Sequence, residues 1–440
     1  MKTIKHLPKI DGDLGWYLSS PNYGIKIGKA LKGIQSADIA IIGAGYTGLS
    51  TAHRLKELYP NKTIAVIEAL EVGQGTSGRN AGFIIDLPHN LDANNNNIED
   101  DLQLYHLNKF SINRLNDFRQ KFNIDCLWHH AGKYMVANET SNIHGLDAFE
   151  TVLKKCKFDY KRLNRAELFK NLGTDFYKEG IFTPGNILMN PSALIRGIGM
   201  GLQENIHIYT NSPVIKIEYG DEHQIHTVGG TLKAKMLVQT INSFTEEFGL
   251  LKNKLAPVFT YGSLTDSLPQ HLVDKHFNNI NPWGLTSAHP AGTTVRYTPD
   301  NRILIRNIID FNASLHSSEQ QRDYAWQQHR KSFIARFPFL KDIDFKYTWG
   351  GMLCMTLNHN SVFEKVTDNI YMVCGCNGVG VAKGTYLGYY MAEMIYGNNS
   401  KELEFIQKTS HVSWVPPEPF RSIGARYKIN KEQATAGNDI

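Results

Sequence analysis

Long hydrophobic runs are missing from this chain of 440 residues. Nowhere do about 18 apolar residues follow one another, as a membrane-spanning helix would require. The opening decapeptide MKTIKHLPKI also lacks the apolar stretch of a secretory signal. We therefore expect a cytoplasmic protein without a membrane span. Its 42% hydrophobic residues are enough to bury a large core in two structural units.

Cysteines are few, five in the whole chain, and they are too scattered for a disulfide framework. Cys374 and Cys376 alternate in the apolar run YMVCGC, and no His or Cys partner lies nearby at zinc spacing. The sequence therefore predicts buried thiols and no metal site. The five residues are Cys126, Cys156, Cys354, Cys374 and Cys376.

The chain also lacks a strong excess of charge of either sign. The chain has 47 basic and 42 acidic residues and a formal net charge of +5. No run of Lys and Arg could follow a nucleic-acid backbone, so we expect a small-molecule partner and no nucleic acid. A slightly basic surface could attract acidic substrates, but net charge does not say where.

A glycine-rich turn joins a predicted strand to a predicted helix near the N-terminus. The apolar run 38–42 is followed by apolar residues at helical spacing as far as Pro60. Gly43, Gly45 and Gly48 form the pattern GxGxxG between the two elements. This spacing gives a tight turn, lets the backbone approach a pyrophosphate and points the helix N-terminus at the phosphates. The sequence therefore predicts a dinucleotide site.

The second predicted strand of this unit, 63–67, is followed by Glu68, twenty residues after Gly48. A carboxylate at this place can accept hydrogen bonds from ribose hydroxyls. An acidic residue argues against a 2′-phosphate, so FAD or NAD is favoured over NADP.

The segment GTSGRNAGF, from Gly75 to Phe83, decides between them. It resembles the flavin-contacting loop of the D-amino-acid-oxidase superfamily, most closely the gamma-glutamylputrescine oxidase branch and its glycine oxidase and sarcosine oxidase neighbours. Similar motifs recur along nearly the whole chain: Asn190-Pro191, the run RYTPDNRIL, Trp349-Gly350-Gly351, and GCNGVGV from Gly375 to Val381. A second glycine-rich turn at a helix start suits negative charge on a reduced flavin, and NAD has no use for it.

The resemblance implies non-covalent FAD. Some family members tether the flavin through Cys or His, but Cys354 lies some residues from the tethering position and the Gly75 loop has no His. The FAD-binding residues that the resemblance implies are Gly43, Gly45, Tyr46, Thr47, Gly48, Glu68, Ala69, Thr76, Ser77, Arg79, Asn80, Ala81, Gly82, Val214, Asn377, Gly378, Val379, Gly380 and Val381.

The resemblance also implies the reaction. A hydride passes from the carbon next to an amine nitrogen to flavin N5, the imine hydrolyses, and O2 reoxidises the flavin to give H2O2. Glycine oxidase-like members hold the substrate carboxylate with an Arg where this chain has Leu353. Sarcosine oxidase-like members use a Lys that matches Ala382, one residue before Lys383. We therefore expect a primary or secondary amine whose acidic group is distant or absent.

The candidate catalytic residues are Trp349, Tyr134, Tyr261 and Arg296, with Tyr297 as a further pocket candidate. Each has a structural alternative, because aromatic residues commonly fill the core. Arg296 and Arg302 could instead pair with Asp300 on a hairpin.

The predicted fold combines α/β and α+β parts. A discontinuous Rossmann-type FAD-binding domain comprises 1–90, 190–250 and 345–440, and a substrate domain rich in β-sheet comprises 91–189 and 251–344. Within them we expect a loop at 94–97, a helix from Ile98 to Lys121, and an extended, partly mobile tail after Trp414.

Two other functions fit the same motifs. One is an amino-acid or aminophosphonate oxidase, or a dehydrogenase of the same fold. The other is a flavin-binding subunit without activity. The sequence does not determine the oligomeric state.

Overall fold

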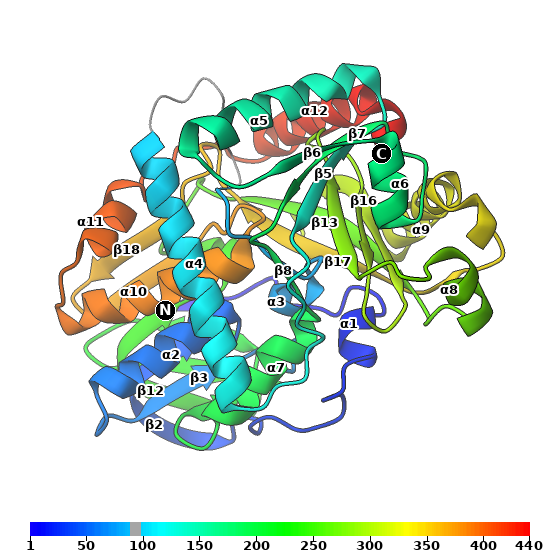
Figure 1. Cartoon of the computed structure of the whole chain (residues 1–440). Coiled ribbons are helices and arrows are strands. Elements are labelled where there is room, and N and C mark those ends of the chain that lie inside the picture. The colour runs from blue at the N-terminus through cyan, green and yellow to red at the C-terminus, as the bar shows by residue number, and fades with distance from the viewer. Residues whose placement is uncertain (89–97) are drawn as a thin grey trace.

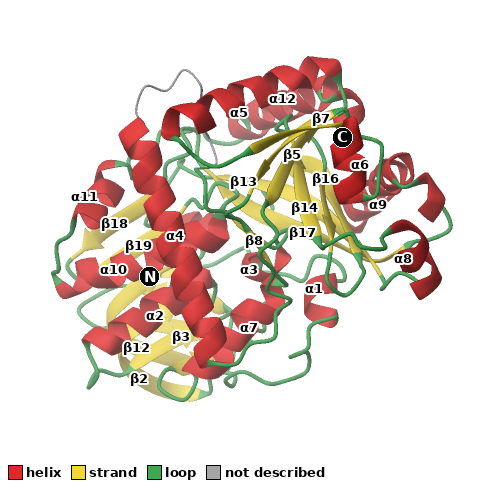
Figure 2. Ribbon diagram, in the orientation of Figure 1, coloured by secondary structure: helices red, strands yellow, loops and turns green. Residues whose placement is uncertain are grey.

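The computed structural model describes residues 1–88 and 98–440. Two large sheets lie side by side with helices packed around them (Figures 1 and 2). The nine-stranded sheet has the order β1 (Lys2–Thr3), β10 (Val214–Glu218), β11 (His223–Thr227), β12 (Gly230–Gln239), β2 (Gly33–Ile42), β3 (Ile64–Ile67) and β9 (His207–Tyr209), and β19 (Ile370–Cys374) joins β12 to β18 (Val362–Thr367). The mixed α/β and α+β fold that the sequence predicts is therefore confirmed.

The second sheet has eight strands. Their order is β17 (Phe345–Met355), β13 (Ala256–Thr265), β16 (Ile303–Phe311), β15 (Thr294–Tyr297), β14 (Trp283–Ser287), β5 (Lys133–Ala137), β7 (Glu179–Thr183) and β6 (Lys161–Asn164). Strands β4 (Phe83–Ile84) and β8 (Ile187–Leu188) form a separate two-stranded sheet.

Twelve α-helices are assigned in the described residues. They are α1 (Gly15–Leu18), α2 (Tyr46–Leu58), α3 (Thr76–Arg79), α4 (Ile98–Lys121), α5 (Ile143–Cys156), α6 (Arg165–Leu172), α7 (Pro191–Leu202), α8 (Gln270–His276), α9 (Glu319–Arg336), α10 (Gly380–Tyr396), α11 (Lys401–Lys408) and α12 (Phe420–Thr435). The helix predicted from Ile98 to Lys121 is confirmed at both ends. The loop expected at 94–97 lies outside the described residues.

The predicted βαβ unit is present, with β2 running parallel to both β3 and β12. A Cβ atom on Gly48 would lie 1.8 Å from the carbonyl oxygen of Gly43. Only glycine therefore lets α2 pack this closely on the end of β2.

Helix α10 lies beside α2 and starts at the same edge of the nine-stranded sheet. The hydroxyl of Ser50 donates to the carbonyl of Thr385 at 2.8 Å, and that of Thr51 donates to the carbonyl of Gly388 at 3.0 Å. A Cβ atom on Gly388 would lie 2.3 Å from the carbonyl oxygen of Thr47. The positive N-terminal ends of both helices therefore lie at the carboxyl ends of β2 and β19, where open α/β sheets bind ligands.

The sheets suggest a changed division of the chain. Residues 345–355, expected in the FAD-binding domain, form β17 of the eight-stranded sheet. Helix α4, expected in the substrate domain, packs on α10 and contributes Leu107, Ile112 and Leu115 to the core around α2. We therefore propose that residues 345–355 belong to the substrate domain and that α4 belongs to the FAD-binding domain.

The tail after Trp414 is not extended, and that expectation is wrong. Its prolines precede a helix, α12, which packs on β16. The side chain of Gln433 accepts from the N–H of Ile309 and donates to its carbonyl, both at 3.2 Å. Beyond α12, buried Asp439 accepts from the backbone N–H of Asn138 at 2.7 Å. Proline is tolerated at a helix start, so the proline cluster marks where α12 begins.

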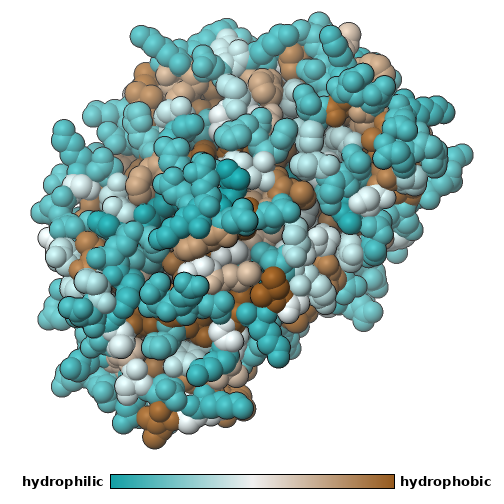
Figure 3. Space-filling view, turned by 60° about the horizontal axis from the view of Figure 1, so that its bottom comes forward, coloured by the Kyte–Doolittle hydropathy of each residue, from teal (hydrophilic) through white to brown (hydrophobic). Residues whose placement is uncertain are grey.

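In the described ranges no helix is long and apolar enough to cross a membrane. On the face shown in Figure 3, hydrophilic side chains cover most of the surface and hydrophobic ones lie in small groups. All five cysteines are buried and free of disulfides. The compartment in which the protein works stays a prediction.

His329 gives the folded state a pH dependence. It is fully buried, its Nδ1 lies 2.7 Å from the Ser263 hydroxyl, and its Nε2 accepts from the N–H of Asn307 at 3.4 Å. Burial lowers the pKa of His329 from 6.5 to about 3. Below about pH 6.5 the unfolded chain binds a proton at His329 that the folded chain excludes. The free energy of unfolding therefore falls by about 1.4 kcal/mol per pH unit below about pH 6.5, and the full contribution of His329 is present above it.

We therefore expect His329→Gln to reduce the loss of unfolding free energy between pH 6.5 and pH 5.0 by about 2 kcal/mol. Urea unfolding at both pH values measures this difference. The control is His144→Gln, because the His144 side chain is 89% exposed. An equal loss in the wild type and in His329→Gln would contradict the assignment.

Candidate functional site

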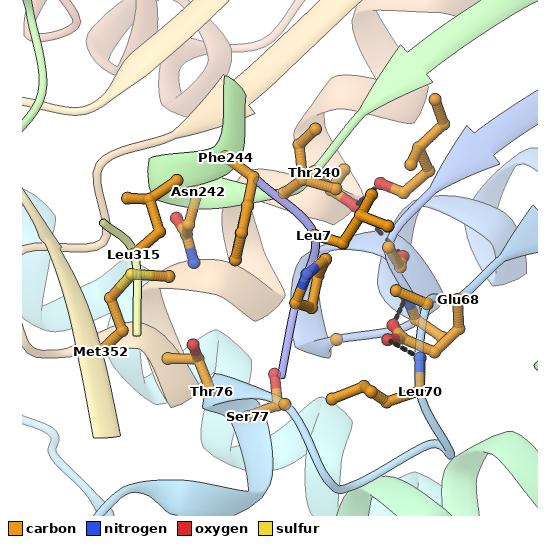
Figure 4. Close-up of a pocket in the computed structure, with 18 of the residues that line it drawn as sticks. Leu7, Glu68, Leu70, Thr76, Ser77, Thr240, Asn242, Phe244, Leu315 and Met352 are labelled. Atoms are coloured by element: carbon orange, nitrogen blue, oxygen red, sulfur yellow. Dashed lines mark hydrogen bonds between the residues drawn. The ribbon is translucent and has the colours of Figure 1, made fainter. Parts of the chain in front are cut away.

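A deep pocket lies across the carboxyl ends of β2, β3 and β12 (Figure 4). The space between its walls, part of which is open solvent, is about 1120 Å³. Glu68 and Leu70 line one end, and Phe244, Leu315 and Met352 line the other. The pocket therefore has the extended shape that a dinucleotide needs.

The GxGxxG turn forms the middle of the pocket. Gly43 has a φ of +104°, and a Cβ atom on it would lie 2.9 Å from the carbonyl oxygen of Thr240. Gly45 is the N-cap of α2 and provides no side-chain cap, and the first turn of α2 contains no acidic residue. The positive end of α2 therefore faces the pocket and is suited to a pyrophosphate.

Glu68 lies at the end of β3 with its carboxylate held by the backbone. One oxygen accepts from the N–H of Ala44 at 2.9 Å, and the other accepts from the N–H of Leu70 at 3.1 Å. Burial raises the pKa of Glu68, and these N–H groups act in the opposite direction. The carboxylate is thus fixed where ribose hydroxyls could donate to it.

Arg79 lines the pocket from the end of α3. Its guanidinium donates to the carbonyls of Gln74 at 2.6 Å, Asp11 at 3.0 Å and Gly350 at 2.9 Å. Its Nη2 atom is buried and has no partner within the described part of the chain. Burial lowers the pKa of Arg79 to about 10. A buried guanidinium with an unpaired N–H calls for an acceptor from a bound ligand.

Arg296 and Trp349, expected to be catalytic, support the loop that follows Arg79. Nη1 of Arg296 donates to the carbonyls of Ala81 at 2.7 Å, Gly82 at 3.1 Å and Met189 at 2.9 Å. Nε1 of Trp349 donates to the carbonyl of Arg79 at 3.0 Å. Both side chains are buried, and neither lines the pocket.

The alternative reading of Arg296 also differs from the structure. Asp300 accepts instead from Nε of Arg302, at 2.9 Å. Arg302 also pairs with Asp266 at 2.9 Å. Of the two arginines that flank Asp300, Arg302 makes the ion pair that the sequence allowed for both.

The three candidate tyrosines lie in different surroundings. Tyr261 packs with Leu315 and Met352 beside the pocket, and its buried hydroxyl has no partner among the described residues. Burial raises the pKa of Tyr261. Tyr134 packs against Phe182, with ring centres 4.9 Å apart, in a separate aromatic core. Tyr297 stacks in that same core, so only Tyr261 lies next to the pocket.

The second glycine motif connects β19 to α10. The Asn377 side chain accepts from the N–H of Thr356 at 2.8 Å and donates to the carbonyls of Gly375 at 3.0 Å and His359 at 2.8 Å. Asn377 therefore shapes the turn. Lys383, one turn into α10, lies 3.5 Å from the carbonyl of His359, and burial lowers its pKa to about 8.

The predicted FAD-binding residues divide into two groups. Those that line the pocket are Gly43, Gly45, Glu68, Ala69, Thr76, Ser77, Arg79 and Val214. Those that do not line it are Tyr46, Thr47 and Gly48 inside α2, Asn80, Ala81 and Gly82 in the loop after α3, and Asn377, Gly378, Val379, Gly380 and Val381 around the start of α10.

Sequence reasoning missed two parts of the pocket. Ile4, Leu7 and Asp11 cross it from the N-terminus, and no motif marks them. Thr240 and Asn242 follow β12. They could have been found, because ligands of parallel sheets bind at the carboxyl ends of strands.

Comparison with known proteins agrees with this geometry. The family model described as DAO, FAD dependent oxidoreductase, matches residues 38–394. The chain belongs to this family. FAD is therefore its cofactor, and the glycine turn, the fixed Glu68 carboxylate and the unpaired N–H of Arg79 fit that molecule.

Two curated relatives cover most of the chain. The probable oxidoreductase OrdL of Haemophilus influenzae is 25% identical over 88% of this chain and 89% of its own. The gamma-glutamylputrescine oxidoreductase of Escherichia coli is 22% identical over 89% of this chain and 92% of its own.

Solved structures share the fold. Glycine oxidase from Geobacillus kaustophilus superposes with a TM-score of 0.70 at 15% identity, over 83% of this chain and 96% of its own. L-proline dehydrogenase from P. horikoshii gives a TM-score of 0.65 at 15% identity, over 87% and 100% of the two chains. At these identities the likeness establishes the fold of this DAO-family chain and leaves its substrate open.

Proposed function

We propose that this DAO-family oxidoreductase oxidises a primary or secondary amine and passes the electrons to O2, with H2O2 as product. When bound, FAD supplies the acceptor for a hydride from the carbon next to the amine nitrogen. The chain's part is to orient that C–H bond and to exclude water. We also propose that FAD is held without a covalent link.

The residues at two expected carboxylate-binding positions carry the proposal. Leu353 lies on β17 opposite Val258, and Ala382 is buried in the core next to α4, where its carbonyl accepts from Ser111. Neither side chain can bind the carboxylate of a simple α-amino acid. The similarity to a gamma-glutamylputrescine oxidoreductase over 89% of the chain supports an amine with a distant acidic group.

The test is an anaerobic absorbance scan of the FAD-loaded protein. Putrescine, gamma-glutamylputrescine, sarcosine, glycine and 2-aminoethylphosphonate are added in turn. We expect one of the first two to bleach the flavin band near about 450 nm, which is a property of the cofactor, and glycine and sarcosine to leave it unchanged.

Each other outcome points elsewhere. Bleaching by glycine or sarcosine would contradict the substrate class. Bleaching without peroxide after air is admitted would indicate a dehydrogenase. A flavin that none of these or other amines bleaches would favour a flavin-binding subunit.

A further inference from the structure

One face of the eight-stranded sheet is turned toward the loop 80–82 that Arg296 and Trp349 support. We call it the flavin-side face. Strand pairing places Gly262 opposite both Trp349 and Arg306, and Thr294 opposite Arg306. Directly paired residues point to the same side of a sheet. Arg306 therefore stands on the flavin-side face with Trp349, and Arg296 stands there too, two residues after Thr294.

Arg306 differs from its neighbouring arginines in having almost no partner. Arg296 is committed to three carbonyls, and Arg302 to two carboxylates. Within the described residues Arg306 makes one long hydrogen bond, from Nη1 to the Thr294 hydroxyl at 3.5 Å, and no ion pair. Burial alone lowers the pKa of Arg306 to about 10.

The surroundings of Arg306 are partly open to solvent. Its neighbours across β13 and β15 are Gly262, which the Trp349 ring covers, and Thr294, which accepts its hydrogen bond. Solvent reaches part of the Arg306 residue although it lies in the middle of a central strand. On β13, β15, β16 and β17 the flavin-side face carries no acidic side chain, so no carboxylate of these strands neutralises the guanidinium.

Arg306 is half-buried and makes one long hydrogen bond among the described residues, so an oxyanion can accept from its remaining N–H groups as a bidentate, charge-assisted pair. We propose that Arg306 binds an oxyanion group, a carboxylate or a phosphonate, at the far end of the amine substrate. This assignment rests on the proposed amine oxidation. Arg306 then determines specificity, because amines without such a group leave its charge unpaired.

The first experiment compares two ligands that differ only by one carboxylate. Gamma-glutamylputrescine and 4-aminobutanoylputrescine are titrated by anaerobic calorimetry into the FAD-loaded protein. We expect the wild type to bind the carboxylate form roughly 10 to 100 times more tightly, as a bidentate charged pair would give. Arg306→Met should remove this preference, and Arg306→Lys should restore part of it.

The control is Arg302→Met, the matched change at the residue directly before β16, whose side chain pairs with Asp266 and Asp300; this variant should keep the preference. The FAD content of each variant shows whether its pocket is intact. If the wild type binds both ligands equally, 2-aminoethylphosphonate decides the outcome. Binding of this compound that Arg306→Met weakens about tenfold or more would identify a phosphonate as the oxyanion, and any other result would overturn the proposal. Wild-type preference that survives in Arg306→Met would overturn it outright.

Failure of the proposed function looks different. If no amine bleaches the flavin but the preference for the carboxylate form and its loss in Arg306→Met are both observed, the oxyanion site stands and the oxidase proposal falls. If an amine bleaches the flavin while Arg306→Met binds every ligand as the wild type does, the oxidase stands and the role of Arg306 falls.

Discussion

Replacing Gly45 with leucine should abolish FAD binding. Gly45 is the N-cap of α2 and lines the middle of the pocket, and even a Cβ atom there would lie 2.6 Å from the Ser77 hydroxyl. The rest of a leucine side chain would fill the space in front of the α2 N-terminus that a pyrophosphate needs. We expect the FAD dissociation constant to rise at least about 100-fold, or ~2.7 kcal/mol.

The measurement is calorimetric FAD binding to the apoprotein, with the flavin content after gel filtration as a second readout. Gly424→Leu on the exposed side of α12 is the matched control, because nothing lies within 4 Å of a Cβ atom there. Gly45→Ala, with and without Ser77→Ala, separates the contact with Ser77 from loss of the phosphate space. A Gly45→Leu protein that remains yellow would refute the phosphate-binding assignment.

Replacing Trp349 with alanine should destabilise the folded protein by about 3–5 kcal/mol. The side chain is 1% exposed and packs edge-on against Trp16, with ring centres 6.3 Å apart. Its truncation leaves a cavity beside the loop 80–82 and removes the hydrogen bond to the carbonyl of Arg79. Trp349→Phe keeps most of the packing and leaves that carbonyl unpaired, so we expect a loss of about 1–3 kcal/mol.

Denaturant unfolding of the apoprotein measures both effects without the contribution of bound FAD. A direct substrate role for Trp349 would give the opposite pattern. Trp349→Ala would then be nearly as stable as the wild type, would keep its FAD, and would be reduced slowly by the amine. That pattern would return Trp349 to the list of catalytic residues.

The sequence alone determined the parts of this protein whose signals are local. The glycine turn, α2 and Glu68 follow one another within about thirty residues, and their spacing encodes a helix start beside a strand end. The start of α7 is also encoded locally, because Asn190 caps it and Pro191 is suited to the first helical position. These features identified a dinucleotide site and, through the resemblance, its FAD.

Only the tertiary structure decided the roles of side chains on the eight-stranded sheet. Tyr134, Arg296, Trp349 and Arg306 lie on four different strands, and strand register determines which face and which partner each one meets. Register depends on pairings between distant segments, such as β13 with β17, which no local pattern encodes. The sequence therefore indicated which cofactor this protein binds, while the fold decided that Arg296 and Trp349 support the loop 80–82 and that, among the described residues, Arg306 makes one long hydrogen bond and no ion pair.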